Sequence, residues 1–278
     1  MSSATITQIR PVVALLTDFG TADGYVGVMK GVIAGIIPNV QLIDITHEVP
    51  PQRIATGAWI LANSYRYFPA QTVFICVVDP GVGSSRGAIA LHAGEWFFVG
   101  PDNGLFSAIL AEETIHSVVE LSNPAYHLPA VSSTFHGRDV FAPGAAHLAA
   151  TGGAILTQLG PARDPSSLAQ LSTMQVTRQG SRIAGQIVHV DAFGNLITNI
   201  PLHMVPELFS AAQAQITFPE QGVGVNKRRQ FFAEGAEPAQ PFIYGDSSQY
   251  IGIAVYNGNA ARTLGVGYGT AFTYEEEL

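Results

Sequence analysis

The chain has 278 residues, of which 47% are hydrophobic and 12% are charged, whereas about a quarter of an average soluble protein is charged. This length allows one large domain or two, and the hydrophobic content supplies a sizeable core although a single cysteine excludes disulfide bonds within the chain. The net charge is −8 and the densest basic run is Lys227-Arg228-Arg229, which argues against nucleic acid and acidic membrane surfaces as partners.

The first residues, MSSATITQIRP, lack the apolar region of a signal peptide. No stretch reaches the roughly 18 consecutive apolar residues that suggest a membrane span. The sequence therefore predicts a cytoplasmic protein. Because charged residues are scarce, we also expect another subunit to cover part of its surface.

Short apolar runs alternate with helix-like segments over residues 1–172. The expected strands are residues 11–16, 40–45, 71–78, 87–92 and 96–99, and the expected helices are residues 24–37, 54–67 and 105–113, with an alanine-rich helix inside 132–153. This alternation indicates βαβ units, so we expect a Rossmann-like α/β domain with a mainly parallel sheet.

The pattern changes after Ser172, where helical periodicity nearly disappears. The short apolar segments are residues 183–190, 214–218, 231–232, 242–244, 250–256 and 271–274. They predict a smaller all-β domain, barrel or sandwich, over residues 180–278, joined to the first domain by a linker at about 173–179.

The stretch VFICVVDPGVGSSRGAIA, residues 73–90, places polar chemistry at a strand end. An apolar run stops at Asp79, and Arg86 follows after a glycine-rich loop. Ligands of α/β sheets bind at the carboxyl ends of the strands, so the pair is placed for chemistry. A structural ion pair that closes the loop is the alternative. The loop is neither a P-loop nor a nucleophile elbow.

A second carboxylate, Asp18, ends the first expected strand in the sequence TDFG. A carboxylate in this place suits the two hydroxyls of a ribose, and a cap for the helix that begins near Gly24 is the alternative. A kinase metal site is excluded, because no glycine-rich loop precedes TDFG.

His136 lies in a loop before Gly137-Arg138-Asp139 and has no second His or Cys at ligand spacing, so we expect no metal site. A purely structural role for His136 stays open, and we assign no functional role to the other histidines.

Asp191, Phe193 and Asn195 form a dense patch in DAFGN. This patch predicts either a tight hairpin or a site for an ammonium group, a stacked ring and a purine edge.

Six motifs occur in the order found in a known family: TDFGTADGYVGVMKG, ITHEVPP, VVDPGVGSSR, GPDNGL, TFHGRDVFAP and DAFGNLITNI. The chain thereby resembles the S-adenosylmethionine hydroxide adenosyltransferases, which are relatives of bacterial fluorinating and chlorinating enzymes. The resemblance covers nearly the whole chain. It implies hydrolysis of S-adenosyl-L-methionine to adenosine and L-methionine, without a metal or organic cofactor. It also implies a homotrimer whose sites lie between the α/β domain of one subunit and the β domain of the next.

The resemblance also assigns residues. The catalytic set falls on Asp79, Arg86 and His136, and the ribose-binding aspartate on Asp18. The other substrate-binding positions are Phe135, Asp191, Phe193, Asn195, Phe232, Ser247, Ser248, Tyr256 and Asn257. Among them, Phe232 is expected near adenine, Ser247 and Ser248 near the methionine carboxylate, and Tyr256 and Asn257 near the base.

Two departures favour hydrolysis over halogenation. Asp79 stands where the halogenating relatives have an aromatic residue, and only residues 92–95 connect the next two strands, where those relatives have a longer insertion. A carboxylate beside the nucleophile would repel halide by several kcal/mol at low dielectric and would orient water instead. Ser248 replaces an arginine of the fluorinating enzymes. The alternatives are a halogenase and a non-catalytic module that binds adenosine or S-adenosylmethionine.

Overall fold

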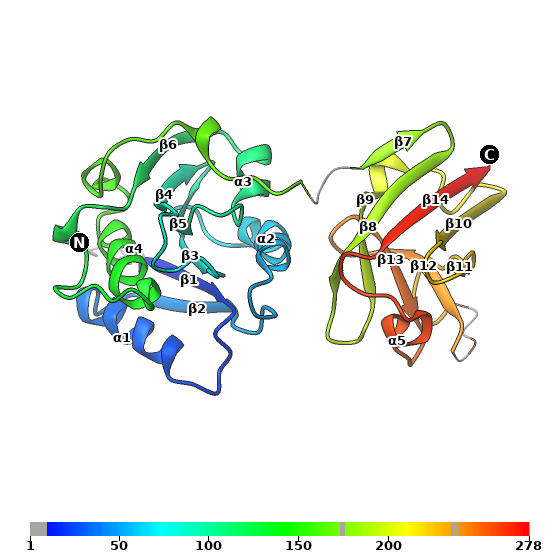
Figure 1. Cartoon of the computed structure of the whole chain (residues 1–278), viewed down its shortest axis with the longest axis horizontal. Helices are drawn as coiled ribbons and strands as arrows, with labels where there is room; N and C mark the ends of the chain where they lie inside the picture. The colour runs from blue at the N-terminus through cyan, green and yellow to red at the C-terminus, as the bar shows by residue number, and fades with distance from the viewer. Residues whose placement is uncertain (1–9, 173–175, 235–236, 238, 278) are drawn as a thin grey trace, which may run out of the picture. The chain divides into compact units, whose positions relative to one another are not determined.

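The computed structural model describes residues 10–172, 176–234, 237 and 239–277. The chain divides into two compact units, Met1–Leu171 and Ser172–Leu278 (Figure 1). The first unit is a mixed sheet with helices and the second is all-antiparallel β structure, which confirms the predicted α/β domain followed by an all-β domain.

The sheet of the α/β unit has six strands. They are β1 Val12–Thr17, β2 Gln41–Thr46, β3 Val73–Val77, β4 Ala88–Ala93, β5 Trp96–Pro101 and β6 Ile115–Glu120, in the order β2-β1-β3-β5-β4-β6. The pairs β1–β2, β1–β3 and β3–β5 are parallel, and β4 is antiparallel to both of its neighbours. Strand β6 was not expected from the sequence, because its half-exposed polar residues hide the apolar pattern.

Both faces of this sheet are covered by helices. Helices α1 Tyr25–Ile36 and α4 Ala142–Ala150 share one core with Val13 and Leu15, while α2 Ile54–Ala62 and α3 Ser107–Glu112 lie on the opposite side with Ala14 and Leu16. Successive strand side chains point to opposite faces, so a strand buried on both sides must be apolar throughout. This is why β1 and β3 appear in the sequence as unbroken apolar runs.

The helix expected at residues 54–67 is shorter. It stops after Ala62, and a single 3₁₀ turn, Tyr65–Tyr67, follows. The side chains of Asn63 and Ser64 donate to the carbonyls of Trp59 and Ile60, at 2.8 and 2.7 Å. Such side-chain bonds compete with the backbone bonds that would extend the helix.

The β unit is one antiparallel sheet around a main hydrophobic core, with a smaller cluster at Phe242, Tyr244 and Ala254. Its strands are β7 Thr177–Gln179, β8 Arg182–Val190, β9 Leu196–Pro201, β10 Gln213–Phe218, β11 Val223–Val225, β12 Pro241–Gly245, β13 Tyr250–Val255 and β14 Ala271–Glu277, with the short helix α5 Ala260–Leu264. The order is β11-β10-β14-β8-β9-β13-β12, and β7 pairs with β8. A bridge from Arg228 to Ile243 links the two ends of this order, as in a nearly closed barrel.

Two sequence expectations differ locally from this unit. Residues 177–179 of the expected linker form β7, and residues 173–175 lie outside the described residues. Phe231 and Phe232 lie in a turn rather than a strand, and both rings are exposed, so their apolar character does not reflect burial in the core.

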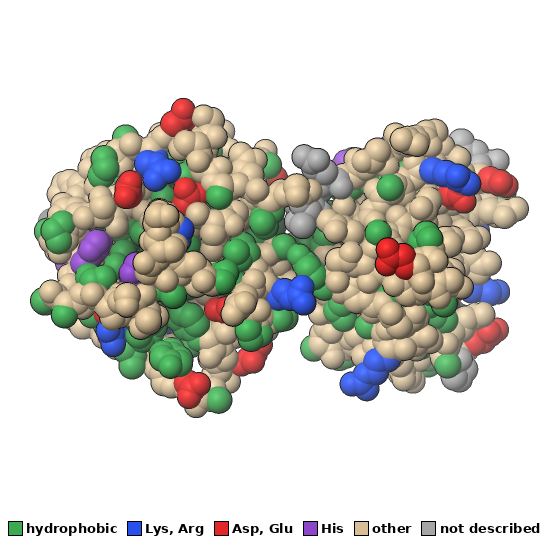
Figure 2. Space-filling model, in the orientation of Figure 1, with side chains coloured by type: hydrophobic (Ala, Val, Ile, Leu, Met, Phe, Trp, Pro, Cys, Tyr) green, Lys and Arg blue, Asp and Glu red, His purple; other side chains and the backbone are tan. Residues whose placement is uncertain are grey.

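On the face of the molecule in Figure 2, acidic and basic side chains are interspersed, with hydrophobic side chains between them. Within the described part of the chain, no helix combines the length and hydrophobicity that a membrane crossing needs.

Candidate active site

Two carboxylates lie at the ends of adjacent parallel strands. Thr17 at the end of β1 is in register with Val77 at the end of β3, and the Asp18 N–H donates to the Val77 carbonyl at 3.4 Å. Asp18 therefore directly follows β1, and Asp79 lies two residues beyond β3. One Asp18 oxygen, Oδ2, accepts a 2.8 Å hydrogen bond from the Gln52 N–H. The sheet thus presents both acidic groups at its carboxyl edge, as the sequence analysis expected.

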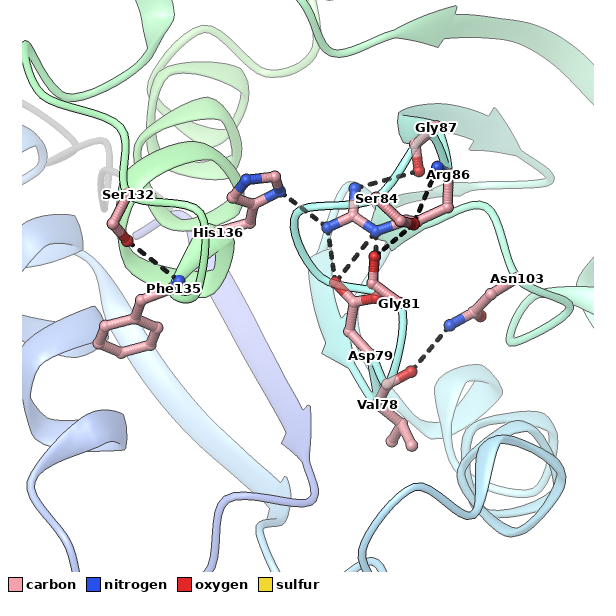
Figure 3. A network of polar contacts seen from close by, with 10 residues as sticks. All are labelled: Val78, Asp79, Gly81, Ser84, Arg86, Gly87, Asn103, Ser132, Phe135 and His136. Carbon is pink, nitrogen blue, oxygen red and sulfur yellow. Dashed lines mark hydrogen bonds and ion pairs between the residues drawn. The ribbon is translucent and has the colours of Figure 1, made fainter.

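Asp79 and Arg86 form a buried fork (Figure 3). Arg86 Nε donates to both carboxylate oxygens, at 3.0 and 3.1 Å, and Nη2 donates to Oδ2 at 2.6 Å. The two side chains are only 4% and 10% exposed. Both charges are largely removed from water, so each depends on the other for stabilisation.

The loop between these residues needs glycine at one point. Gly83 has φ +76°, and a Cβ there would lie 2.3 Å from the Ser133 carbonyl oxygen. Only glycine permits this approach. The contact fixes the loop of Asp79 and Arg86 beside the segment that carries His136.

His136 completes the network through Arg86, whose Nη2 lies 2.8 Å from His136 Nδ1. A guanidinium can only donate, so Nδ1 is the acceptor and the ring proton is on Nε2. Burial and the positive charge of Arg86 hold the pKa of His136 below its usual range. The neutral imidazole is therefore the stable form beside the ion pair.

His136 directly precedes a π-helix, Gly137–Phe141, which continues into α4. The buried Asp139 in this turn accepts from the Ser132 N–H at 2.8 Å and pairs with Arg138. The π-turn, a feature frequent at functional sites, carries the carboxylate that joins it to the segment before His136. Asp139 was not among the residues expected at the site, although it stands in the motif TFHGRDVFAP.

A further residue that the sequence analysis left without a role is Asn103. Its side-chain amide donates to the Val78 carbonyl at 2.9 Å, one residue before Asp79, and its Oδ1 accepts from the Leu105 N–H (Figure 3). Asn103 therefore braces the strand end that carries the carboxylate. Its only signal in the sequence is its place in GPDNGL.

Phe135 lies in an aromatic cluster rather than in the ion-pair network. Its ring meets those of Phe19 and Tyr25 edge to face, at centroid distances of 6.0 and 5.3 Å. Tyr25 is exposed, so the cluster forms an accessible apolar surface on the α/β unit.

In the β unit, Asp191 closes a tight turn between β8 and β9. Its Oδ1 accepts from the backbone N–H groups of Phe193 and Asn195, and its Oδ2 accepts from the Asn195 side-chain amide at 2.8 Å. Gly194, with φ +83°, packs against Asn259 at the start of α5. The turn leaves the Phe193 ring 77% exposed, while Asn195 is buried.

The turn that carries Ser247 and Ser248 repeats this pattern. Asp246 Oδ1 accepts from the N–H groups of Ser248 and Tyr250, two and four residues on, as Asp191 does. Burial raises the pKa of the Asp246 carboxyl. Both turns thus use one aspartate oxygen to hold their own backbone.

The remaining expected residues flank the β12–β13 pair. Phe232 stacks at a tilt on Tyr244, with centroids 4.9 Å apart, and is partly exposed. Tyr256 packs on the same small cluster, and Asn257 follows it in an exposed left-handed conformation, with φ 49°. Ser247 and Asn257 lie beyond opposite ends of β13, about 17 Å long at 3.4 Å per residue. The structure therefore does not gather these residues at one point of the β unit.

Comparison with known proteins identifies the family. Residues 13–159 match the SAM hydroxide adenosyltransferase N-terminal domain, and residues 185–273 match the C-terminal domain. The chain belongs to the SAM hydroxide adenosyltransferase family.

Curated relatives of this SAM hydroxide adenosyltransferase family member agree with the assignment. An (R)-S-adenosyl-L-methionine hydrolase of Salinispora arenicola is 40% identical over 92% of the chain and 94% of its own length. The enzyme of that name from Thermus thermophilus is 35% identical over 93% and 96%. A fluorinase of Actinoplanes is 27% identical over 88% and 91%. A crystal structure of an uncharacterised conserved protein from Thermotoga maritima superposes with a TM-score of 0.86, at 33% identity over 94% and 99%.

The acids and histidines of the chain are candidate metal ligands. Among the residues that the structure describes, no three His, Cys, Asp or Glu side chains lie together as metal ligands. The polar groups of the α/β unit instead form a linear network from Asp79 through Arg86 to His136.

Proposed function

We propose that this chain hydrolyses S-adenosyl-L-methionine to adenosine and L-methionine by in-line attack of water on C5′ of the substrate. The observation that carries the proposal is the buried carboxylate of Asp79, held by Arg86 at a strand end next to Asp18. Relatives at 33–40% identity that are named (R)-S-adenosyl-L-methionine hydrolase support the same reaction and suggest the (R) sulfonium epimer as a substrate.

In the proposed reaction, the water oxygen forms a bond to C5′ while the C5′–S bond breaks. The electron pair of that bond moves to sulfur, which leaves as the neutral thioether of methionine, and the water releases one proton. Because the leaving group is already good, the main task of the site is to position the nucleophile. Positioning of this kind can supply about 7–11 kcal/mol in favourable cases.

Asp79 is the group that orients the water. Its oxygens accept three hydrogen bonds from Arg86, and because a carboxylate has about four lone-pair sites, one remains to accept from a water. A carboxylate already bound to a guanidinium is better suited to holding a water proton by a hydrogen bond than to removing it early. We therefore assign Asp79 to alignment first and to proton acceptance late in the step.

Arg86 serves chiefly to hold Asp79. Its Nε and Nη2 hydrogens go to Asp79 and His136, and Nη1 reaches the Gly87 carbonyl at 3.4 Å. At most one Nη1 hydrogen is left to stabilise hydroxide. The guanidinium also cancels much of the Asp79 charge, so repulsion of halide is weaker than a bare carboxylate would give.

His136 holds the far side of the guanidinium. With Nδ1 accepting from Arg86, the base site of the neutral ring is occupied and Nε2 carries a proton. A relay through His136 would first require a change of tautomer. This arrangement supports a role in positioning and in excluding a second positive charge.

Asp18 binds the ribose hydroxyls and so aims C5′, while Phe135 contributes apolar surface beside it. The other substrate-binding assignments are the residues of the β domain: Asp191, Phe193, Asn195, Phe232, Ser247, Ser248, Tyr256 and Asn257. The exposure of Phe193 and Phe232 supports a ligand or a neighbouring subunit that covers them.

We further propose a homotrimer with sites between the α/β domain of one subunit and the β domain of another. Co-expression of Asp79→Ala with Asn195→Ala tests this arrangement. Mixed trimers regain part of the activity when the two residues come from different chains, and they stay inactive when both act within one chain. The sedimentation mass of the purified protein gives the number of subunits.

Cell fractionation tests the cytoplasmic location, which stays a prediction from the sequence.

The decisive test is to mix the purified protein with each sulfonium epimer of S-adenosylmethionine and to separate the products by chromatography. Release of adenosine and methionine, with ¹⁸O from labelled water in the 5′-hydroxyl, is the expected result. Formation of 5′-chloro- or 5′-fluoroadenosine with added halide would favour the halogenase alternative. Tight binding without any product would favour a non-catalytic module.

A further inference from the structure

A series of polar contacts begins at Thr17, the residue before Asp18, and runs from two buried side chains to two partly exposed ones, in residues to which the proposed mechanism gives no role. Thr17 Oγ1 and His47 Nδ1 are 2.9 Å apart. His47 Nε2 is 3.0 Å from Asp44 Oδ1, a contact bent away from an ideal hydrogen bond, and Lys30 Nζ donates to Asp44 Oδ2 at 2.6 Å. Thr17 is fully buried and His47 is 4% exposed.

A β-bulge produces this juxtaposition. In the β1–β2 pair Leu15 is opposite Asp44 while Leu16 is opposite Thr46, so β2 has one extra residue at this point. Bulges re-aim side chains and are common next to active sites. Here the shift brings His47, the residue after β2, against Thr17, the last residue of β1.

The direction of the contacts follows from their chemistry. The carboxylate of Asp44 can only accept, which favours the His47 tautomer with its proton on Nε2, and in that neutral tautomer Nδ1 is an acceptor. The Thr17 hydroxyl then donates to Nδ1, and its oxygen accepts from the Phe19 N–H at 3.3 Å. These two contacts restrict the rotamer of Thr17.

Around this series, the backbones of two motifs are joined. The Gly20 N–H donates to the His47 carbonyl at 2.8 Å, and the Val49 N–H donates to the Thr17 carbonyl at 3.4 Å. The same joined segment then presents the Gln52 N–H to Asp18 Oδ2. Gln52 has φ 65°, a left-handed conformation that the surrounding contacts must maintain.

We propose that Thr17 and His47 are positioning residues that fix the Asp18 carboxylate for the two ribose hydroxyls of the ligand. The inference rests on the proposed function, in which Asp18 binds the ribose. Thr17 is too deeply buried to touch substrate, so it acts only through the loop that follows it. The motif ITHEVPP thereby gains a role: it holds the carboxylate that TDFG supplies.

The test compares binding of adenosine and of 2′,3′-dideoxyadenosine, which lacks both hydroxyls, by calorimetry. In the parent protein we expect a clear preference for adenosine. Thr17→Val removes the hydroxyl but keeps the shape, and we expect it to reduce that preference about five- to tenfold, the worth of one hydrogen bond. Thr17→Ser, which restores the hydroxyl, should recover most of it.

A matched control is available in the same two segments. Thr21 donates to Glu48 across them at 3.2 Å, but both groups are exposed and outside the series. Thr21→Val should leave the preference unchanged. His47→Asn keeps an acceptor near Thr17 and should retain more of the preference than His47→Ala.

The inference is overturned if Thr17→Val weakens both ligands equally, which a general loss of folding would produce, or weakens neither. It is also overturned if the parent protein does not prefer adenosine. Failure of the proposed function has a different signature. The parent protein would then release no adenosine from either epimer of S-adenosylmethionine, however tightly it binds adenosine and 2′,3′-dideoxyadenosine.

Discussion

Replacing Arg86 with glutamine tests whether the Asp79 charge depends on its partner. Arg86 makes three contacts of 2.6–3.1 Å to a carboxylate that is 4% exposed. Removing one member of a buried ion pair leaves the other charge uncompensated, at a cost of about 3–5 kcal/mol. We expect Arg86→Gln to lower the free energy of unfolding of the α/β unit by about this amount.

The sequence offers a selective probe for this measurement. Its two tryptophans, Trp59 and Trp96, both lie in the α/β unit, so urea unfolding followed by tryptophan fluorescence reports that unit alone. Arg66→Gln is the control, since Arg66 is 48% exposed although it pairs with both Glu112 at 2.9 Å and Glu113 at 2.8 Å. An exposed pair contributes about 1 kcal/mol or less.

The double variant Asp79→Asn/Arg86→Gln completes the cycle. It should be less destabilised than the sum of the two single variants, because the orphaned charge is removed together with its partner. Our account would be refuted if Arg86→Gln cost no more than Arg66→Gln, since the fork would then be stabilised by solvent rather than by mutual pairing.

Three further predictions concern activity and pH. Asp79→Ala should lower kcat at least about 100-fold with a small change in substrate affinity. Asp18→Ala should lower both kcat and substrate affinity. If the two variants had the same kcat and KM, these roles would be contradicted. The pKa of His136 is lowered in the folded protein by burial and positive charge, so the unfolded chain takes up the proton first on acidification. The stability that neutral His136 contributes is therefore fully present above its ordinary pKa of about 6.5, and it is lost as the pH falls through the pKa of the folded state. In urea unfolding between about pH 7 and 5, His136→Gln should make the free energy of unfolding less dependent on pH. Gly83→Ala places a Cβ 2.3 Å from the Ser133 oxygen and should lower kcat about tenfold or more, while a variant with normal kcat would show that the loop adjusts.

The fold was largely predictable because buried strand positions must be apolar, and this pattern is visible in the sequence. Strands β1 and β3 are covered on both faces, so their apolar runs and the carboxylates after them were apparent. Strand β6 and the end of α2 were not apparent from the sequence. Strand β6 lies at the edge of the sheet and has no regular apolar pattern, and α2 ends where side chains bond back to its own carbonyl groups.

The candidate site was predictable only in part, and for a different reason. Local sequence placed Asp18 and Asp79 at strand ends, but the partners of those ends come from distant segments. Asn103 reaches Val78 across 25 positions, and His47 reaches Thr17 across 30. Such contacts depend on strand order and on a β-bulge, and neither can be predicted from the local sequence.

The covered sheet has a consequence for how this architecture can change. The two hydrophobic cores lie against the middle of the strands, while Asp18, Asp79 and their neighbours begin only where the strands end. A substitution among these loop residues therefore changes the polar groups at the strand ends while both hydrophobic cores keep their residues. We therefore expect related chains to vary the chemistry at these strand ends without repacking either core, although a change that breaks the Asp79–Arg86 pair also removes its contribution to stability.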